Sequence, residues 1–392
     1  MRTEDFDYDL PRELIAQEPA TPRDSSRLMV LLPGRAAEPA REEGAAGTAA
    51  GAGPAIEHRH FRDLPDYLHA GDLIVFNRTR VIRARLIGRK AGTGGKVEVL
   101  LLRPATPGGT PGRADWVEGW EWEVLVRPGR RVRPGVELTF GDDPGAPGLM
   151  GEVRSRTASG GRVISFRPSK PGADFQGTLE ELGQMPLPPY ITRPLGDPER
   201  YQTVYARERG SAAAPTAGLH FTHRVLKALR DAGVESAEII LHIGLDTFRP
   251  VREGRVEAHR MHREWYEVPA ETAAAVSACR ERGGRVVACG TTVVRALESA
   301  ADPAFLGRVR PVAGDTGLFI YPGYRFRVVD ILLTNFHLPR STLLMLVSAF
   351  GGRERVLASY EEAARLGYRF YSFGDAMLVF PERQRGESGG GA

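Results

Sequence analysis

Short runs of alternating or continuous hydrophobic residues recur between residues 72 and 166, and Gly- and Pro-rich turns separate them. Several short strands at this spacing, without a helical period, are typical of a small barrel or sandwich. The pattern predicts strands over 72–76, 81–88, 96–102, 120–126, 132–140 and 162–166. The middle of the chain is therefore predicted to be an all-β unit.

The pattern changes after Thr178, where helical and strand-like segments alternate. Thr222 precedes the first helical segment and Gly233 follows it, at the positions where helices take their caps. Helices are predicted over 223–232, 270–282, 292–300, 342–349 and 353–366, and strands over 27–32, 237–243, 285–289 and 330–334. Strand, tight loop and helix in alternation favour an α/β layer.

The order of these segments predicts an α/β fold with an inserted all-β domain. We expect the larger α/β domain to be built from both ends of the chain, residues 1–70 and 171–392, and the small β-barrel from residues 71–170. Residues 34–54 are of low complexity and lack a hydrophobic period, so we expect a flexible, solvated insertion there.

Composition limits the class of protein. Of the 392 residues, 42% are hydrophobic, which is enough for a sizeable core. Cys279 and Cys289 are too few for a disulfide framework, a Cys-rich zinc finger or an iron–sulfur cluster. The first residues lack the apolar core of a signal peptide, and the apolar run 343–350 is far shorter than the roughly 20 residues that span a bilayer. We therefore expect a soluble, cytoplasmic protein that contacts no membrane.

The net charge is modest and comes mostly from arginine. The 53 basic and 49 acidic residues give +4, and because four of the basic residues are lysines, 49 of the 53 are arginines. Arginine suits phosphate and stacked-base contacts better than lysine. A charge of +4 on a chain of this size does not by itself indicate nucleic-acid binding.

The densest polar cluster is the segment AAPTAGLHFT at 213–222. Its small residues, Thr216 and Gly218 among them, let the backbone approach a ligand closely. His220 lies just before a predicted helix N-terminus, where backbone N–H groups favour an anion, and a neutral imidazole can take a proton near pH 7. A turn with a capping Thr222 and a structural His220 is the alternative interpretation.

A second candidate lies where the strand 285–289 runs into Gly290, Thr291 and Thr292. In α/β sheets, ligands bind at the carboxyl ends of strands. Glycine admits a ligand close to the backbone, and the two hydroxyls can donate to a carboxylate or a ribose. The segment is neither a P-loop nor a dinucleotide-binding fingerprint. Cys289 could be a nucleophile, but a small buried hydrophobe is the more common case.

Further polar candidates follow the strand 330–334 and fill the segment 368–375. Asn335 and His337 stand at the end of that strand, where a site residue is expected. The segment 368–375 mixes aromatic residues with Arg369, which could stack on bases or simply close the last helix.

The segment 259–264 carries two imidazoles three residues apart, His259 and His262. They could bind zinc together with His220, His242 or His337, although the spacing is not that of the HExxH motif. Arg260 and Arg263 fit a phosphate-facing loop at least as well.

Many motifs in the right order resemble the S-adenosylmethionine:tRNA ribosyltransferase-isomerase family of queuosine biosynthesis, along nearly the whole chain. They are DFDYDLP (5–11), LIAQ (14–17), RDSSR (23–27), NRT (77–79), ARL (84–86), PLPPYI (186–191), ERYQTVYA (199–206), AAPTAGLHFT (213–222), GTT (290–292), LTNFHLP (333–339), STLLM (341–345), YRF (368–370) and GDAM (374–377). Arg80, Arg83, Arg207 and Asp246 depart from the commonest pattern of that family.

The resemblance implies a small β-barrel inserted into an α/β domain, and a reaction that consumes S-adenosylmethionine as a ribosyl donor. In that reaction the ribose moves to the aminomethyl group of a 7-deazaguanine base at the tRNA wobble position and becomes an epoxycyclopentane. The product is epoxyqueuosine, and adenine and methionine leave. The sulfonium acidifies the neighbouring ribose carbon, so the resemblance implies a base, an acid for adenine, and no metal or other cofactor.

On this basis we expect the following roles. Proton transfer is assigned to His220, Asn335 and His337; the donor pocket to Thr216, Gly218, Thr222, Gly290, Thr291 and Thr292; and tRNA or base contacts to Arg260, Arg263 and Arg369. We expect a monomer. The alternatives are a non-catalytic RNA-binding protein and a metal-dependent hydrolase that uses His259 and His262.

Overall fold

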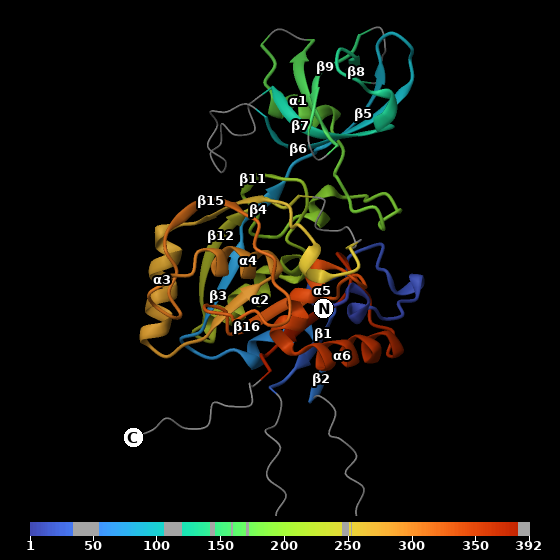
Figure 1. Cartoon of the computed structure of the whole chain (residues 1–392). Helices are drawn as coiled ribbons and strands as arrows, with labels where there is room; N and C mark the ends of the chain where they lie inside the picture. The colour runs from blue at the N-terminus through green and yellow to red at the C-terminus, as the bar shows by residue number, and fades with distance from the viewer. Residues whose placement is uncertain are drawn as a thin grey trace, which may run out of the picture.

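The structure is a computed structural model, and it describes residues 1–33, 55–105, 120–141, 146–157, 160–169, 172–244, 251 and 253–382. A small barrel stands above a larger α/β body (Figure 1). The predicted insertion at 34–54, Asp246 and the tail from Arg383 lie outside the described residues.

The barrel closes in the order β10-β7-β6-β5-β8-β9. Its strands are β5 (Arg85–Lys90), β6 (Lys96–Pro104), β7 (Glu121–Arg127), β8 (Glu137–Phe140), β9 (Leu149–Arg156) and β10 (Arg162–Pro168). Alternate residues of each strand point inward, so that Leu86, Val99 and Val124 meet in one buried core. Helix α1 (Phe175–Leu182) adds Phe175 and Leu179 to that core.

Three of the predicted barrel strands need correction, and β9 was not predicted. The run 72–76 is β3 (Leu73–Asn77), which pairs in the large sheet and not in the barrel. The run 81–88 is divided between β4 (Thr79–Val81), which belongs to the other body, and β5. The run 132–140 shortens to β8 because Pro134 and Gly135 interrupt it, Gly135 with a φ of +83°.

Within the described ranges, nine strands form one mixed sheet in the order β15-β13-β12-β3-β14-β16-β17-β1-β2. They are β1 (Arg27–Leu31), β2 (Ile56–His60), β3 (Leu73–Asn77), β12 (Glu235–Leu241), β13 (Glu264–Val268), β14 (Val286–Cys289), β15 (Val312–Thr316), β16 (Ile331–Asn335) and β17 (Ala376–Val379). Strands β12, β3, β14 and β16 run parallel, so their carboxyl ends share one edge of the sheet.

The central strands are buried on both faces, which is why they read as continuous apolar runs. In β3, Leu73 and Val75 face one core, whereas Ile74 and Phe76 face the other. Helix α2 (His223–Asp231) covers the second face. The first face is covered by α3 (Ala270–Glu281), α4 (Thr291–Ser299), α5 (Thr342–Gly351) and α6 (Arg353–Arg365). The predicted α/β fold with an inserted all-β barrel is confirmed.

The chain enters and leaves the barrel at neighbouring positions. Arg85 and Gln184 bond to each other through both backbone amides, with N–O distances of 3.2 and 2.8 Å. Below them β4 pairs in parallel with β11 (Glu208–Ser211). The strands of the large sheet lie before and after the barrel in sequence. The domain boundaries at residues 70 and 171 stay predictions.

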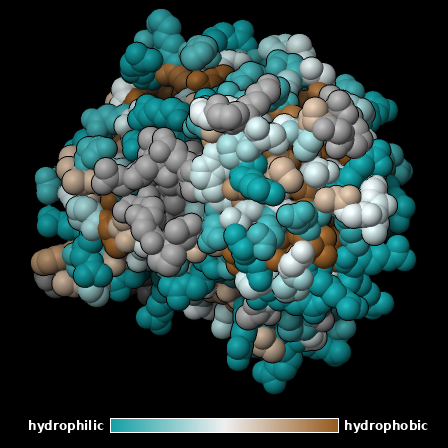
Figure 2. All heavy atoms as spheres, turned by 90° about the horizontal axis from the view of Figure 1, so that it is seen from above, coloured by the Kyte–Doolittle hydropathy of each residue, from teal (hydrophilic) through white to brown (hydrophobic). Residues whose placement is uncertain are grey.

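The surface seen from the barrel side is mostly hydrophilic, with hydrophobic residues in separated patches (Figure 2). In the described part of the chain the exposed large hydrophobic residues are Phe305, Leu306, Val312 and Leu366. No helix in the described ranges combines the length and the apolar character that crossing a membrane requires.

Candidate active site

A cavity lies at the sheet edge where the parallel strands β12, β14 and β16 end. It encloses about 610 Å³ of space, counting its open mouth. The carboxyl ends of these strands and the residues just after them supply one wall, through Ile243, Gly290 and Asn335. This position fits the rule that ligands of α/β sheets bind at strand carboxyl ends. The other lining residues are Tyr190, Ala214, Pro215, Thr216, Ala217, Thr291, Thr292, Thr334, Phe336, His337, Leu338, Ser341, Leu343, Tyr371 and Ser372.

The N-terminus of α4 forms part of this wall. Gly290 has a φ of +99°, which would strain any other residue, and it turns the chain from β14 into the helix. Thr292 Oγ1 is buried and finds no hydrogen-bond partner among the described residues. We call this atom the open hydroxyl. Together with the N–H groups of the first helical turn, it suits a polar or anionic group of a ligand.

The polar segment 213–222 contributes only part of what its sequence predicts. Thr216 lines the cavity. Gly218 does not belong to the described cavity lining. A Cβ at this position would collide with the Tyr205 hydroxyl, so the close packing of Tyr205 accounts for the glycine. Thr222 is the N-cap of α2: its Oγ1 accepts from Val225 N at 3.3 Å and donates to Asp24 Oδ2 at 2.8 Å. For Gly218 and Thr222 the structure therefore supports the structural interpretation.

His220 is buried behind the cavity wall rather than in it. Its ring stacks on Phe61 with the centroids 5.0 Å apart. Nδ1 lies 2.7 Å from Ser26 Oγ, and Nε2 lies 3.1 Å from Asn335 Nδ2. Burial lowers the pKa of His220 to about 4, against the opposing effect of Asp375. The imidazole is therefore neutral near pH 7, with both nitrogens engaged.

Asn335 connects His220 to the cavity. It is the last residue of β16 and lines the cavity wall. Its Nδ2 also donates to the carbonyl of Tyr371 at 3.1 Å and lies 3.5 Å from that of Asp375. Asn335 Oδ1 is buried and has no hydrogen-bond partner within the described ranges. We call this atom the open acceptor.

His337 is the predicted catalytic imidazole that does line the cavity. Its Nε2 lies 2.8 Å from Thr334 Oγ1, and its backbone is held by the hydroxyls of Tyr8 and Tyr360. Burial lowers the pKa of His337 to about 3, so the ring is neutral near pH 7. A neutral imidazole at the wall can accept or donate a hydrogen bond, but it is a weak base until a ligand changes its surroundings.

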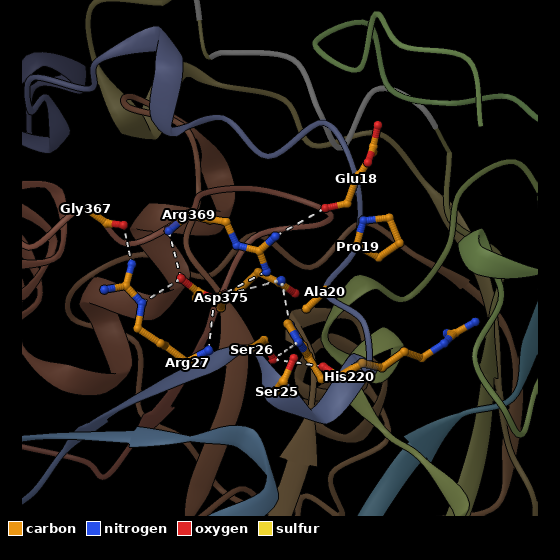
Figure 3. Close-up of polar contacts among 12 residues, drawn as sticks. Glu18, Pro19, Ala20, Ser25, Ser26, Arg27, His220, Gly367, Arg369 and Asp375 are labelled. Carbon is orange, nitrogen blue, oxygen red and sulfur yellow. Dashed lines mark hydrogen bonds and ion pairs between the residues drawn. The ribbon is translucent and has the colours of Figure 1, made fainter. Parts of the chain in front are cut away.

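Arg369 lies near the site but is occupied by Asp375. The buried Asp375 carboxylate accepts from the backbone N–H of Arg27 at 2.9 Å and of Arg369 at 2.8 Å. The guanidinium of Arg27 bonds to the same carboxylate at 3.2 Å, and that of Arg369 lies 3.5 Å from it. Figure 3 shows both arginines converging on Asp375, with Arg369 also reaching Glu18. A structural contact therefore already engages Arg369, and its predicted base contact stays a prediction.

Arg260 and Arg263 are exposed and do not belong to the described cavity lining. Arg263 lies 3.4 Å from the carbonyl of Asp315. Their contact with tRNA stays a prediction.

The two neighbouring histidines pair with separate carboxylates. His259 Nδ1 lies 2.9 Å from Glu253, and His262 Nε2 lies 3.2 Å from Glu264. Burial disfavours the charge of Glu264, but Arg295 and His262 bring its pKa down to about 2. In the part of the chain that the structure describes, no three His, Cys, Asp or Glu side chains are placed to hold a metal ion.

Sequence reasoning missed three residues that line the cavity and come from loops and not from the strand ends, Tyr190, Tyr371 and Ser372. Tyr190 and Ser372 line it, and their hydroxyls lie 2.7 Å apart. Tyr371 lines it with a φ of +70°, a conformation that is strained for a residue with a side chain and that recurs at functional sites. These residues come from loops without a hydrophobic period, although the PLPPYI and YRF motifs lie at or beside them.

Comparison with known proteins gives concordant results. A family model described as queuosine biosynthesis protein matches residues 3–379. The S-adenosylmethionine:tRNA ribosyltransferase-isomerase of Moorella thermoacetica is 55% identical over 97% of this chain and 100% of its own length. That of Symbiobacterium thermophilum is 53% identical over the same shares. A crystal structure of S-adenosylmethionine tRNA ribosyltransferase from Thermotoga maritima is 39% identical, covers 96% of this chain and 100% of its own, and superposes with a TM-score of 0.49.

The family model spans nearly the whole chain, and these relatives are matched over their full length. The cavity lies among the motifs that carried the resemblance, since GTT (290–292) and LTNFHLP (333–339) supply its wall. This chain belongs to the queuosine biosynthesis protein family, the family of the S-adenosylmethionine:tRNA ribosyltransferase-isomerases.

Proposed function

We propose that this chain transfers the ribose of S-adenosylmethionine to the aminomethyl group of a 7-deazaguanine base at the tRNA wobble position and isomerises it, giving epoxyqueuosine in tRNA. Adenine and methionine are released. The names of its relatives support the substrates. The structural observation that carries the proposal is the cavity at the strand carboxyl ends, with the open hydroxyl and the open acceptor in its lining residues.

The cavity offers what this chemistry needs from the protein. The donor carries a carboxylate, an ammonium, two ribose hydroxyls and an adenine amine. The open hydroxyl and the first turn of α4 suit the negative group or a ribose oxygen, and the open acceptor suits an N–H or O–H group. The apolar lining, including Ile243, Phe336 and Leu338, excludes water from a reaction that proceeds through a carbanion next to sulfur.

The reaction balances without an external redox partner. A base removes the proton from the ribose carbon beside the sulfonium, and the resulting ylide expels adenine, which leaves with a proton. The tRNA amine then attacks the opened sugar, and ring closure breaks the bond to sulfur and releases methionine. His337 is the candidate for proton transfer that the cavity exposes. Tyr190, whose pKa burial raises, keeps its proton near pH 7, and its hydroxyl is bonded to that of Ser372.

We further propose that the enzyme is a cytoplasmic monomer and needs no cofactor besides the donor that it consumes. The sulfonium itself supplies the acidity that a metal would otherwise provide. Turnover that persists after dialysis against a chelator, and a single-chain mass by light scattering, are the expected results. Loss of turnover that added metal restores would contradict the cofactor proposal.

The direct test uses purified protein, S-adenosylmethionine and two tRNA preparations. One carries 7-aminomethyl-7-deazaguanine at the wobble position, and the control carries guanine there. We expect release of adenine and methionine and a nucleoside of epoxyqueuosine mass with the first tRNA alone. Binding of both tRNAs without adenine release would instead favour the non-catalytic RNA-binding alternative.

A further inference from the structure

A chain of hydrogen bonds runs behind the cavity wall from the N-terminal segment to Asn335. It begins at the carbonyl of Arg23, which accepts from Ser26 Oγ at 3.2 Å. Ser26 Oγ then meets His220 Nδ1, as Figure 3 shows, and His220 Nε2 meets Asn335 Nδ2. All three side chains are buried: Ser26 is 2% exposed, His220 5% and Asn335 2%.

The neighbours of Asn335 decide which way the carboxamide faces. The amide nitrogen lies 3.1 Å from the Tyr371 carbonyl, which only accepts hydrogen bonds. Turning the carboxamide over would place two oxygens against each other, so Nδ2 faces Tyr371 and His220. Its two hydrogens are then both used, one on each partner.

The same logic fixes the proton on the histidine. Because Asn335 Nδ2 donates, His220 Nε2 must accept and carries no hydrogen, which places the ring hydrogen on Nδ1. That hydrogen goes to Ser26 Oγ, whose own hydrogen goes to the Arg23 carbonyl. Each polar hydrogen of these side chains has an acceptor, and the Asp375 carbonyl, 3.5 Å from Asn335 Nδ2, is a further, more distant one. The remaining group is the open acceptor, Asn335 Oδ1, which has no partner on the described residues.

We propose that Ser26 and His220 are positioning residues that hold the Asn335 carboxamide in one orientation, so that its Oδ1 accepts a hydrogen bond from an N–H or O–H group of the molecule in the cavity. This inference rests on the proposed function for the identity of that molecule, S-adenosylmethionine. Its adenine amine, ribose hydroxyls and methionine ammonium are the candidate donors, and an acceptor held in this way discriminates against analogues that lack the matching group.

The arrangement also assigns His220 a role other than proton transfer. Its ring does not belong to the described cavity lining and stacks on Phe61. Both ring nitrogens are hydrogen-bonded to protein side chains, those of Ser26 and Asn335. Protonation of Nε2 would set two N–H groups against each other. The neutral form that burial favours is the form that the chain of hydrogen bonds requires.

The first experiment compares two substitutions of one residue. In His220→Gln the side-chain oxygen can take the place of Nε2 and accept from Asn335, but it cannot transfer a proton. We expect donor affinity and single-turnover adenine release within about threefold of the unmodified enzyme. In His220→Ala the carboxamide is released, and we expect S-adenosylmethionine to bind about tenfold more weakly, the usual effect of losing one hydrogen bond. Ser26→Ala should lie between the two.

Each result has a defined meaning. If His220→Gln loses roughly 10² to 10⁴-fold in the chemical step, as loss of an acid–base group does, the positioning role is refuted. If a folded His220→Ala binds and reacts normally, it is refuted as well. Should His220→Ala fail to fold, His220→Gln and Ser26→Ala decide by the same criteria. His242→Ala is the matched control, because His242 is also a buried histidine stacked on an aromatic ring and bonded to a hydroxyl, that of Thr79, and it does not belong to the described lining. We expect a lower melting temperature and unchanged donor affinity.

The second experiment identifies the ligand group. Competitive binding is measured in the unmodified enzyme and in His220→Ala for donor analogues that lack the adenine amine hydrogens, one ribose hydroxyl, or the ammonium. In the unmodified enzyme, the analogue that lacks the group bound by Asn335 should bind about tenfold more weakly than S-adenosylmethionine. In His220→Ala, where the contact is already lost, removing the same group should change the affinity little. Equal losses in both proteins for every analogue would overturn the inference. Because the unmodified enzyme is assayed for S-adenosylmethionine binding and adenine release in parallel, failure of the proposed function would be seen separately.

Discussion

Replacing Thr292 with valine should stabilise the ligand-free protein and lower its affinity for S-adenosylmethionine. The open hydroxyl is buried without a partner among the described residues, and such a group costs roughly 1–3 kcal/mol relative to its hydrated state in the unfolded chain. Valine fills nearly the same volume with a methyl group, so no cavity forms. We expect the free energy of unfolding to rise by about 1 kcal/mol, and the dissociation constant of S-adenosylmethionine to rise about tenfold through the lost hydrogen bond.

Thr272 provides a matched control with the opposite sign. It is also a buried threonine in the first turn of a helix, α3, but its Oγ1 donates to the carbonyl of Glu238 at 2.5 Å. Thr272→Val removes that bond and leaves the carbonyl unsatisfied, which should lower the free energy of unfolding by roughly 1–3 kcal/mol. It is not among the described cavity residues, so donor affinity should stay unchanged.

Urea unfolding of the ligand-free proteins and titration calorimetry with S-adenosylmethionine measure both quantities. The reasoning depends on the sign of the stability change more than on its size. If Thr292→Val is destabilised as much as Thr272→Val, the Thr292 hydroxyl already has a partner in solution, and its assignment to the ligand is refuted. If stability rises but donor affinity is unchanged, the hydroxyl is unsatisfied for another reason.

Three more predictions concern acid stability, a buried carboxylate and salt. Burial lowers the pKa of three histidines, to about 4 for His220 and about 3 for His242 and His337. Below pH 6.5 the unfolded chain binds protons that the folded protein does not, so the contribution of these histidines to the free energy of unfolding is complete only above that pH. As the pH falls from 6.5 to 4, the free energy of unfolding should decrease by up to about 1.4 kcal/mol per pH unit and per histidine. A free energy of unfolding by urea that does not change with pH would contradict this. Asp375→Ala leaves two arginines without their shared carboxylate and should lower the free energy of unfolding by about 2 kcal/mol. The loss is limited because both arginine side chains are about one-third exposed, so that water partly screens their charges. Asp375→Asn should have an intermediate effect. Affinity for tRNA should fall steeply between low and moderate salt, since phosphate contacts release counterions, and a salt-independent constant would mean that the arginines reflect composition alone.

Residues whose placement follows from a strand end could be predicted from the sequence. The apolar runs of β14 and β16 located Gly290, Thr292 and Asn335, because the carboxyl ends of parallel strands share one edge. The strands β13 and β17 were missed, since strands of five and four residues are too short to show a clear pattern.

The function of a polar residue within the polar segment was harder to predict. Gly218 and Thr222 share the segment of Thr216, yet one packs on Tyr205 and the other caps a helix. His220 has the residue type of a catalyst but lies behind the wall, because Phe61 and Ser26 enclose it from distant parts of the chain. Such long-range contacts leave no local periodicity in the sequence.

The pairing of β1 with β17 has a consequence for how the chain folds as it is synthesised. Leu28 pairs with Ala376, near opposite ends of the chain, whereas all six barrel strands lie between Arg85 and Pro168. Domains fold as units when their contacts become available, and contacts that are distant in sequence form late. We expect the barrel to fold on the ribosome before β1 can pair with β17, because β17 is synthesised later. Proteolysis of stalled nascent chains should then find residues 85–168 protected well before the N-terminal segment. The cavity at the strand carboxyl ends should form only once the last strand of the sheet has emerged.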